Sequence, residues 1–128
     1  EERQNMKVIS TEKAPAAIGP YSQAIVINGM VFTSGQIPLN PATGEIMGTT
    51  VEEQAEQVMK NLGEVLKAAG SSYEKAVKTT CFLADMGDFG AFNEVYGKYF
   101  TGKPARSCVA VKTLPKNVLC EVEVIAEI

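Results

Sequence analysis

Four side chains near the C-terminus have the types that chemistry requires. They are the guanidinium of Arg106, the thiol of Cys108 and the carboxylates of Glu121 and Glu123. The chain contains no histidine, which excludes Ser-His-Asp and Cys-His catalysis, HExxH zinc sites and imidazole acid-base chemistry. Any chemistry must therefore use carboxylates, hydroxyls, a thiol, backbone groups and water.

These four side chains lie on two segments whose residues alternate in character, as in β-strands joined by a short loop. In the first strand Arg106 and Cys108 share one face. In the second, Glu121 and Glu123 oppose an apolar set, which is Cys120, Val122, Val124, Ala126 and Ile128. If the apolar faces pack against helices, all four polar side chains lie on the other face of one sheet and suggest a site. A solvated face with a cross-strand ion pair is the alternative.

An earlier hairpin is predicted by Asn28-Gly29, a strong two-residue turn signal. It joins strands at about Ser22–Ile27 and Met30–Gln36. Met6–Ile9 alternates weakly and is expected to form a first edge strand.

A second polar group borders this hairpin. Gly19-Pro20 predicts a turn that places Tyr21 at the mouth of the first strand. Ser34 and Gly35 follow the second strand, where a glycine lets the backbone approach a ligand closely. The beginning of an ordinary turn explains these two residues equally well.

A helix is predicted from Thr50, because Thr50 and Glu53 have the spacing of a capping box. It follows an ordered loop over Ile37–Gly48, which is rich in proline, glycine and asparagine, and Gly70 supplies its stop. Its apolar residues recur every three or four positions, at Val51, Ala55, Val58, Leu62, Val65, Leu66 and Ala69.

An interior strand is predicted within Tyr73–Ala84, with Val77, Thr79, Cys81 and Leu83 on one face. Asp88 is a candidate cap for a second helix over Phe89–Phe100. The apolar stripe of that helix is expected to pack in the core, and Asn93 lies off the stripe, free for a polar role.

The order of elements predicts an α+β two-layer sandwich, with a mixed sheet of about six strands and two helices on one face. The chain has 128 residues, which suits one domain over residues 6–128, with residues 1–5 as an extension. The other sheet face is left without a helix. Its apolar residues favour contact with a symmetric partner.

Composition narrows the class of protein. Three widely spaced cysteines without a CxxC pair indicate free thiols in a reducing cytosol. The net charge of −3 argues against binding to a phosphate backbone. No apolar run approaches the roughly 20 residues that span a bilayer, so we expect a cytoplasmic protein without membrane contact.

Four motifs in order along the chain resemble the RidA family, also called YjgF, of reactive imine deaminases. They are AAIGPYSQA, TSGQIP, FNEVYGKYF, and KPARSCVAV followed by EVEVIA. The resemblance implies a fold similar to that of trimeric chorismate mutases, and a homotrimer with clefts between subunits. It also implies hydrolysis of 2-imino acids such as 2-iminobutanoate and 2-iminopropanoate, in exchange with enamines, to 2-oxo acids and ammonia, without a cofactor or metal.

The resemblance also implies roles for individual residues. Arg106 would hold the substrate carboxylate, Glu121 would position water and move protons, and the backbone amide of Cys108 would help fix the carboxylate. The family places further groups around the ligand, at Tyr21, Ser34, Gly35 and Asn93, with the Tyr21 hydroxyl orienting substrate or water.

Several alternatives stay open. A trimer that binds a 2-oxo acid without turnover would use the same cleft. Some relatives are described as endoribonucleases and translation inhibitors, although the negative charge and the lack of histidine give that activity little support. Motif alignment favours Glu121 over Glu123 for the proton, but spacing does not separate them. Ala110 stands where relatives often carry an acid, and Cys120 where they carry an aliphatic residue, so the charge in the cleft can differ.

Overall fold

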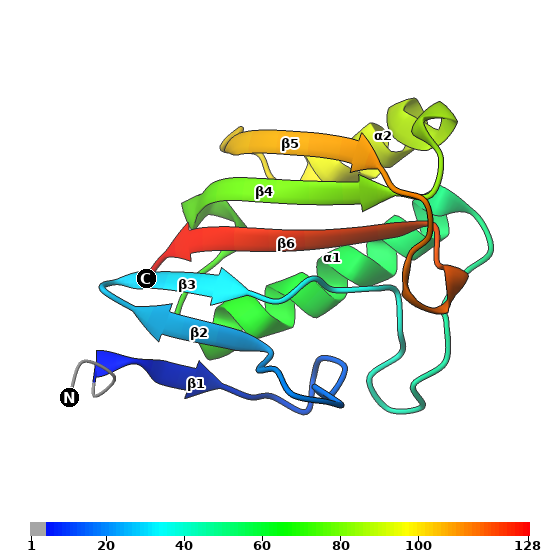
Figure 1. Cartoon of the computed structure of the whole chain (residues 1–128). Helices are drawn as coiled ribbons and strands as arrows, with labels where there is room; N and C mark the ends of the chain where they lie inside the picture. The colour runs from blue at the N-terminus through cyan, green and yellow to red at the C-terminus, as the bar shows by residue number, and fades with distance from the viewer. Residues whose placement is uncertain (1–4) are drawn as a thin grey trace.

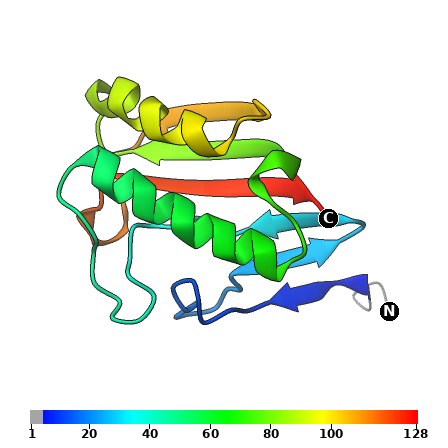
Figure 2. The ribbon, with the colours of Figure 1, turned by 180° about the vertical axis from the view of Figure 1, so that it is seen from behind.

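Six strands form one mixed sheet, and both helices cover the same face of it (Figure 1). The computed structural model describes residues 5–128, so the expected extension over residues 1–5 lies outside it except for Asn5. The strand order across the sheet is β1-β2-β3-β6-β4-β5. The elements are β1 (Lys7–Ile9), β2 (Ala24–Ile27), β3 (Met30–Thr33), α1 (Val51–Ala68), β4 (Ala76–Leu83), α2 (Phe89–Tyr99), β5 (Ala105–Ala110) and β6 (Cys120–Glu127). Seen from behind, α1 and α2 both lie in front of the sheet (Figure 2), which confirms the two-layer prediction.

The first hairpin is confirmed, with positive φ angles of 53° at Asn28 and 73° at Gly29 that suit a tight turn. β1 pairs with β2 at the edge of the sheet, as expected. β3 is shorter than expected because it leaves β6 after Thr33. There the hydroxyl of Thr33 accepts a hydrogen bond from the Val124 amide at 3.0 Å. Pairing with β6 resumes only at Gln36.

α1 begins and ends as the sequence predicts. Thr50 and Glu53 form a reciprocal capping box, and Gly70 has φ of +84° just after the helix. The predicted apolar residues face the sheet and are buried except Ala69, which is half-buried. Two polar side chains, Gln54 and Asn61, are also buried in this face, which the apolar pattern did not predict.

The last two strands do not form the expected hairpin. β5 pairs in parallel with β4, and β6 pairs antiparallel with the other side of β4. Because α2 connects β4 to β5, the chain returns beside β4 in the same direction, as in a βαβ unit. β4 is therefore the interior strand that was predicted, and it separates the two strands that carry the candidate polar side chains.

The expected sharing of one sheet face by the four polar side chains is wrong. Arg106 pairs across the sheet with Thr79 of β4, and Thr79 pairs with Val124 of β6. Paired residues point to the same face, and both Thr79 and Val124 are buried on the helix side. Glu121 is level with Phe82, which is level with Val109, on the side without helices. Arg106 and Cys108 thus face the helices, whereas Glu121 and Glu123 face away from them. Both faces of β5 carry small or apolar residues, so the alternation of residues did not show which face of this strand meets the helices.

Three local expectations also need correction. Val77 is 44% exposed, because a β-bulge between Ala76 and Lys78 moves it out of the apolar face of β4. Ile128 lies beyond the end of β6 and is also 44% exposed. Asp88 occupies the position before α2, but its side chain makes no capping hydrogen bond.

The face without helices carries large apolar side chains. Phe32 is 42% exposed and Val109 is 47% exposed. Ile125 and Phe82 lie on the same face and are half-buried. Such a surface is typical of a face that meets another protein. Neither α-helix within residues 5–128 has the length and apolar character needed to cross a bilayer.

Candidate functional site

Arg106 lies among neutral groups at the β5 edge of the sheet. One of its terminal nitrogens donates a hydrogen bond of 2.6 Å to Oδ1 of Asn93. Its guanidinium carbon lies 4.7 Å from the centre of the Tyr96 ring and 5.3 Å from that of Phe89. No carboxylate within residues 5–128 lies at ion-pair distance from it. A half-buried cation with free N–H groups is therefore available for an anion.

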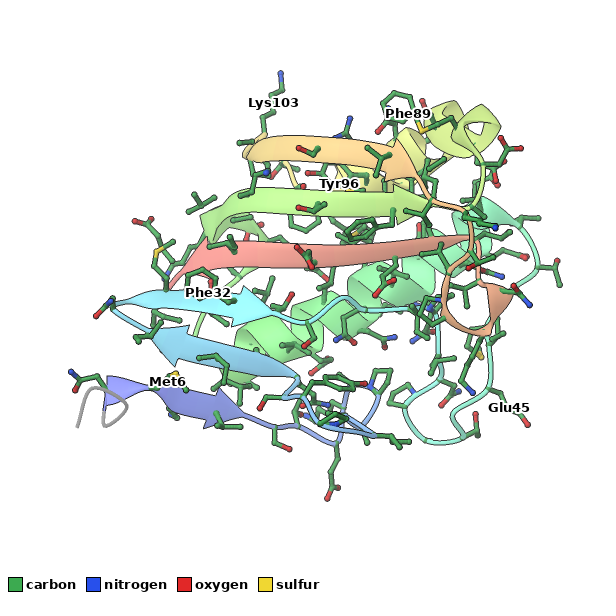
Figure 3. All side chains as sticks on the ribbon, viewed as in Figure 1. Met6, Phe32, Glu45, Phe89, Tyr96 and Lys103 are labelled. Atoms are coloured by element: carbon green, nitrogen blue, oxygen red, sulfur yellow. The ribbon has the colours of Figure 1, made fainter. Side chains whose placement is uncertain are left out.

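α2 supplies all three of these partners. Phe89, Asn93 and Tyr96 follow one another at helical spacing of four and three residues, so they line one side of the helix. Figure 3 shows Phe89 near the start of α2. The hydrogen bond between the hydroxyls of Tyr96 and Thr79 places the Tyr96 ring between α2 and β4. The expectation that Asn93 lies off the apolar stripe of α2 is wrong, because it faces the same guanidinium as Phe89 and Tyr96 of that stripe. Its polar role is the hydrogen bond that it accepts from Arg106. Tyr96 and Phe89 were predicted only as core, although their spacing from Asn93 gave the signal that they face the same group.

A hollow of about 640 Å³ adjoins the guanidinium. It is lined by Asn93, Tyr96, Gly97, Phe100, Lys103 and Arg106, together with Thr101 and Pro104. Cys108 lies two residues further along β5 on the same face and is half-buried. Burial raises the pKa of its thiol, and the charge of Arg106 opposes this only in part. Cys108 therefore stays a neutral thiol near pH 7, which argues against its use as a nucleophile.

A second group of candidate residues gathers where β3 leaves β6. A Cβ atom built on Gly35 would overlap the carboxylate of Glu121 and lie 2.9 Å from its Cδ atom. Gln36 holds this approach by exchanging two backbone hydrogen bonds with Val122, of 2.8 and 3.2 Å. Only glycine fits at position 35 while the carboxylate keeps its place. Gly35 therefore leaves the space that the Glu121 carboxylate occupies, which an ordinary turn does not require.

Ser34 connects this group to the segment that carries Tyr21. Its hydroxyl donates to the carbonyl of Ser22 at 2.6 Å, and its amide donates to the carbonyl of Gln23 at 2.9 Å. Tyr21 itself is 55% exposed, and its amide donates to the carbonyl of Gly19 at 2.9 Å in the predicted turn. Ser34 thus ties the segment that follows Tyr21 to the residues just before Gly35, which lies against Glu121.

Glu121 differs from Glu123 in its surroundings. Burial raises the pKa of Glu121, and the negative charge of Glu123 two residues away raises it further. Glu123 is exposed on the same side of β6. The raised pKa favours Glu121 as the carboxyl that exchanges a proton.

The predicted site residues therefore form two groups. Arg106, Asn93 and Cys108 lie at the β5 edge on the helix side, and the group of Tyr21, Ser34, Gly35 and Glu121 lies around the junction of β3 and β6. The first group has a positive charge that would attract an anion, and the second has a carboxyl whose pKa is raised.

Comparisons with known proteins cover almost the whole chain. A family model described as Endoribonuclease L-PSP matches residues 11–128. The Mus musculus protein named 2-iminobutanoate/2-iminopropanoate deaminase is 53% identical over 121 residues, which cover 94% of this chain and 90% of the mouse protein. A Lactococcus lactis protein named as a regulator, AldR, is 56% identical over 124 residues, with 96% and 98% of the two chains covered. The crystal structure of E. coli TdcF with bound serine aligns with a TM-score of 0.90 at 46% identity, over 95% of this chain and 98% of that one.

Proposed function

The chain belongs to the Endoribonuclease L-PSP family, also called the RidA or YjgF family, and from that premise we propose that it hydrolyses 2-imino acids to 2-oxo acids and ammonia. Its substrates are small imines such as 2-iminobutanoate and 2-iminopropanoate and their enamine tautomers. Relatives named as deaminases for these two compounds, at 48–53% identity, support the substrate class.

The observation that carries the proposal is the state of Arg106. It is a half-buried cation whose supports are an amide and two aromatic rings, so no carboxylate within residues 5–128 neutralises its charge. A guanidinium binds a carboxylate through two parallel hydrogen bonds, a geometry that lysine does not reproduce. Arg106 is thus the group that holds the carboxylate of a 2-imino acid, with the amide of Cys108 beside it.

Glu121 handles water and protons. Water adds to the imine carbon while Glu121 takes one of its protons, and the proton then passes to the nitrogen. In the resulting carbinolamine the same carboxylate takes the hydroxyl proton and returns it to the amine nitrogen. The C=O bond then forms as the C–N bond breaks, which releases ammonia and leaves the 2-oxo acid. The raised pKa of Glu121 suits both steps, because the same carboxyl must accept and return a proton. The reaction needs orientation and proton transfer, and it proceeds without a cofactor.

The active site is proposed to lie between subunits of a homotrimer. Arg106 and Glu121 lie on opposite faces of one chain, so the two groups meet on one substrate when they come from neighbouring copies. The exposed apolar residues Phe32 and Val109 support burial of the helix-free face, and the family resemblance supports three copies. Residues 6–128 form the repeating domain. The three free cysteines support a reducing cytosol as its setting.

The test is hydrolysis of 2-iminobutanoate generated in place by a threonine dehydratase, followed as loss of its semicarbazone. The protein is expected to suppress the semicarbazone, and Arg106→Ala is expected to abolish this effect while the oligomer stays intact by light scattering. Full activity of Arg106→Ala would exclude the proposed site.

A trimer that binds without turnover is the second candidate, and the relative solved with bound serine favours it. Titration of 2-oxobutanoate that shows binding, together with no turnover of the imine, would select it. RNA binding is tested by retention on immobilised RNA at low salt. The net charge of −3 leads us to expect none.

A further inference from the structure

Tyr96 lies directly beneath the guanidinium of Arg106. The centre of its ring is 4.7 Å from the guanidinium carbon, closer than the ring of Phe89 at 5.3 Å. A guanidinium over the face of an aromatic ring is attracted by the ring quadrupole and can stack in parallel with it. This contact orients the plane of the cation as well as stabilising it.

The Tyr96 ring is fixed from behind. Its hydroxyl and that of Thr79 share a buried hydrogen bond of 2.7 Å. The ring also packs against Phe100 and Phe92, with centroid distances of 4.8 and 5.9 Å. Thr79 is the residue of β4 that lies level with Arg106 in the parallel pair. The strand that neighbours Arg106 therefore also sets the position of the ring on which Arg106 lies.

Among residues 5–128, the supports of Arg106 are all neutral. A carboxylate in the place of Asn93 or Tyr96 would hold the guanidinium more strongly, but it would occupy the N–H groups and cancel the charge. An aromatic face does neither, because it contacts the plane of the cation, leaves the N–H groups at its edges free and keeps its charge. The neutral supports thus combine a fixed orientation with a charge that remains available to a ligand.

We propose that Tyr96 is a positioning residue that holds the guanidinium of Arg106 so that its free N–H edge meets a carboxylate ligand. Tyr96 thereby sets the preference of the site for carboxylates over neutral analogues of the same shape. The inference rests on the proposed role of Arg106 in holding the substrate carboxylate. Tyr96 contacts the arginine and not the reacting atoms.

The experiment compares Tyr96→Leu, which removes the ring, with Tyr96→Phe, which keeps the ring and removes only the hydroxyl. For each variant, KM and kcat for 2-iminobutanoate are measured, with inhibition constants for 2-oxobutanoate and for its neutral amide, 2-oxobutanamide. Tyr96→Leu is expected to raise KM and the 2-oxobutanoate inhibition constant about tenfold, within the range of cation–π energies. The inhibition constant of the amide and kcat at saturation change much less. Tyr96→Phe stays within about twofold of the wild type in all four quantities.

Thr79→Val controls for the loss of stability. It breaks the same hydrogen bond as Tyr96→Phe while leaving the ring in place, so both variants lower the unfolding midpoint and retain the preference for the carboxylate. Phe89→Leu removes the more distant ring at the half-buried start of α2 and is expected to shift the preference in the same direction by a smaller factor. If Tyr96→Leu does not fold, Phe89→Leu tests whether an aromatic ring beside Arg106 sets the preference for the carboxylate.

Two results would overturn the positioning role alone. One is an unchanged preference for 2-oxobutanoate over the amide in Tyr96→Leu, or in Phe89→Leu where Tyr96→Leu does not fold. The other is an equal loss of preference in Tyr96→Phe, which would assign the effect to the hydroxyl. A wild-type protein that neither deaminates the imine nor binds 2-oxobutanoate would instead remove the proposed function, and the positioning role with it.

Discussion

Arg106 and Glu121 lie on opposite faces of the sheet, on strands that β4 separates. Arg106 projects from β5 toward α2, and Glu121 projects from β6 to the side without helices. Neither residue can turn to the other face, because a shift of one position would carry every apolar neighbour with it. This geometry is the reason for the proposal that the two residues of one site come from two copies of the chain.

Mixing two inactive variants tests this arrangement. Arg106→Ala and Glu121→Gln subunits are unfolded together, mixed in equal amounts and refolded. If each site takes Arg106 from one copy and Glu121 from its neighbour, about one site in four combines two intact halves, and about a quarter of wild-type activity returns. Each variant refolded alone is the control. A mixture as inactive as the separate variants would place both residues of a site in the same copy.

Gly35→Ala is expected to displace the carboxylate of Glu121, because the added Cβ would overlap it. Activity should fall by at least about tenfold, in line with the loss of a positioned acid-base group. Gly90→Ala is the matched control, since a Cβ there meets nothing within 4 Å. It should leave activity unchanged and stabilise α2 slightly. Steady-state deaminase assays and thermal unfolding of both variants measure these effects, and an active Gly35→Ala would refute the role of the close approach.

The pH dependence of activity should follow Glu121. The base must be ionised, so the rate falls as the pH falls through the raised pKa of this carboxyl. Glu123→Gln removes the nearby negative charge that helps to raise this pKa, so the acid limb of the kcat profile should move to lower pH. Glu127→Gln, an exposed change farther along β6, should leave the profile in place. If the pH profiles of Glu123→Gln and the wild type coincide, the acid limb does not report the ionisation of Glu121.

Stability should depend on the same carboxyl with a defined sign. Because its pKa is raised in the folded state, the folded chain holds this proton at pH values where the unfolded chain has lost it. The contribution of Glu121 to the free energy of unfolding therefore falls as the pH rises from the ordinary carboxyl pKa of about 4.3 through the raised value. Urea unfolding across this range should show a weaker decline in Glu121→Gln than in the wild type. An identical pH dependence would contradict the burial of this carboxyl.

Asn61 should stabilise the loop that leads away from Gly35. Its buried amide nitrogen donates to the carbonyls of Ile37 and Leu39, at 3.1 and 3.0 Å. Asn61→Ala leaves both carbonyls without this donor and should cost about 2 kcal/mol or more in urea unfolding. Gln57→Ala removes a half-exposed amide that donates only to Asn61 and should cost less than about 1 kcal/mol. Equal losses of unfolding free energy in the two variants would contradict the stabilising role of the Asn61 hydrogen bonds.

Much of the fold could be predicted because local signals agree with the final packing. The capping box at Thr50 begins α1, Asn28-Gly29 forms the hairpin, and alternation along β6 separates Glu121 from the buried Val122. Each of these depends on neighbouring residues, which the sequence displays directly.

The position of β5 could not be predicted in the same way. Alternation places Arg106 and Ser107 on opposite faces of β5, but it does not say which of them faces the helices. Val109 is apolar and is compatible with either face. That choice depends on the crossover through α2 and on the partners that Asn93 and Tyr96 offer to the arginine. Both are contacts between elements, so the site was expected on one face and is divided between two.

The place of β6 in the sheet has a consequence for the synthesis of the protein. β6 is last in chain order among the elements, yet it lies between β3 and β4 and is the only strand that joins β1–β3 to β4 and β5 within residues 5–128. While a ribosome still holds this segment, the two halves of the sheet share no strand pairing, and the carboxylate of Glu121 has not reached Gly35. Such distant pairing is intrinsically slow to form. The nascent chain therefore exposes two unpaired inner edges until β6 emerges, and chaperones that cover strand edges should bind it most during that interval.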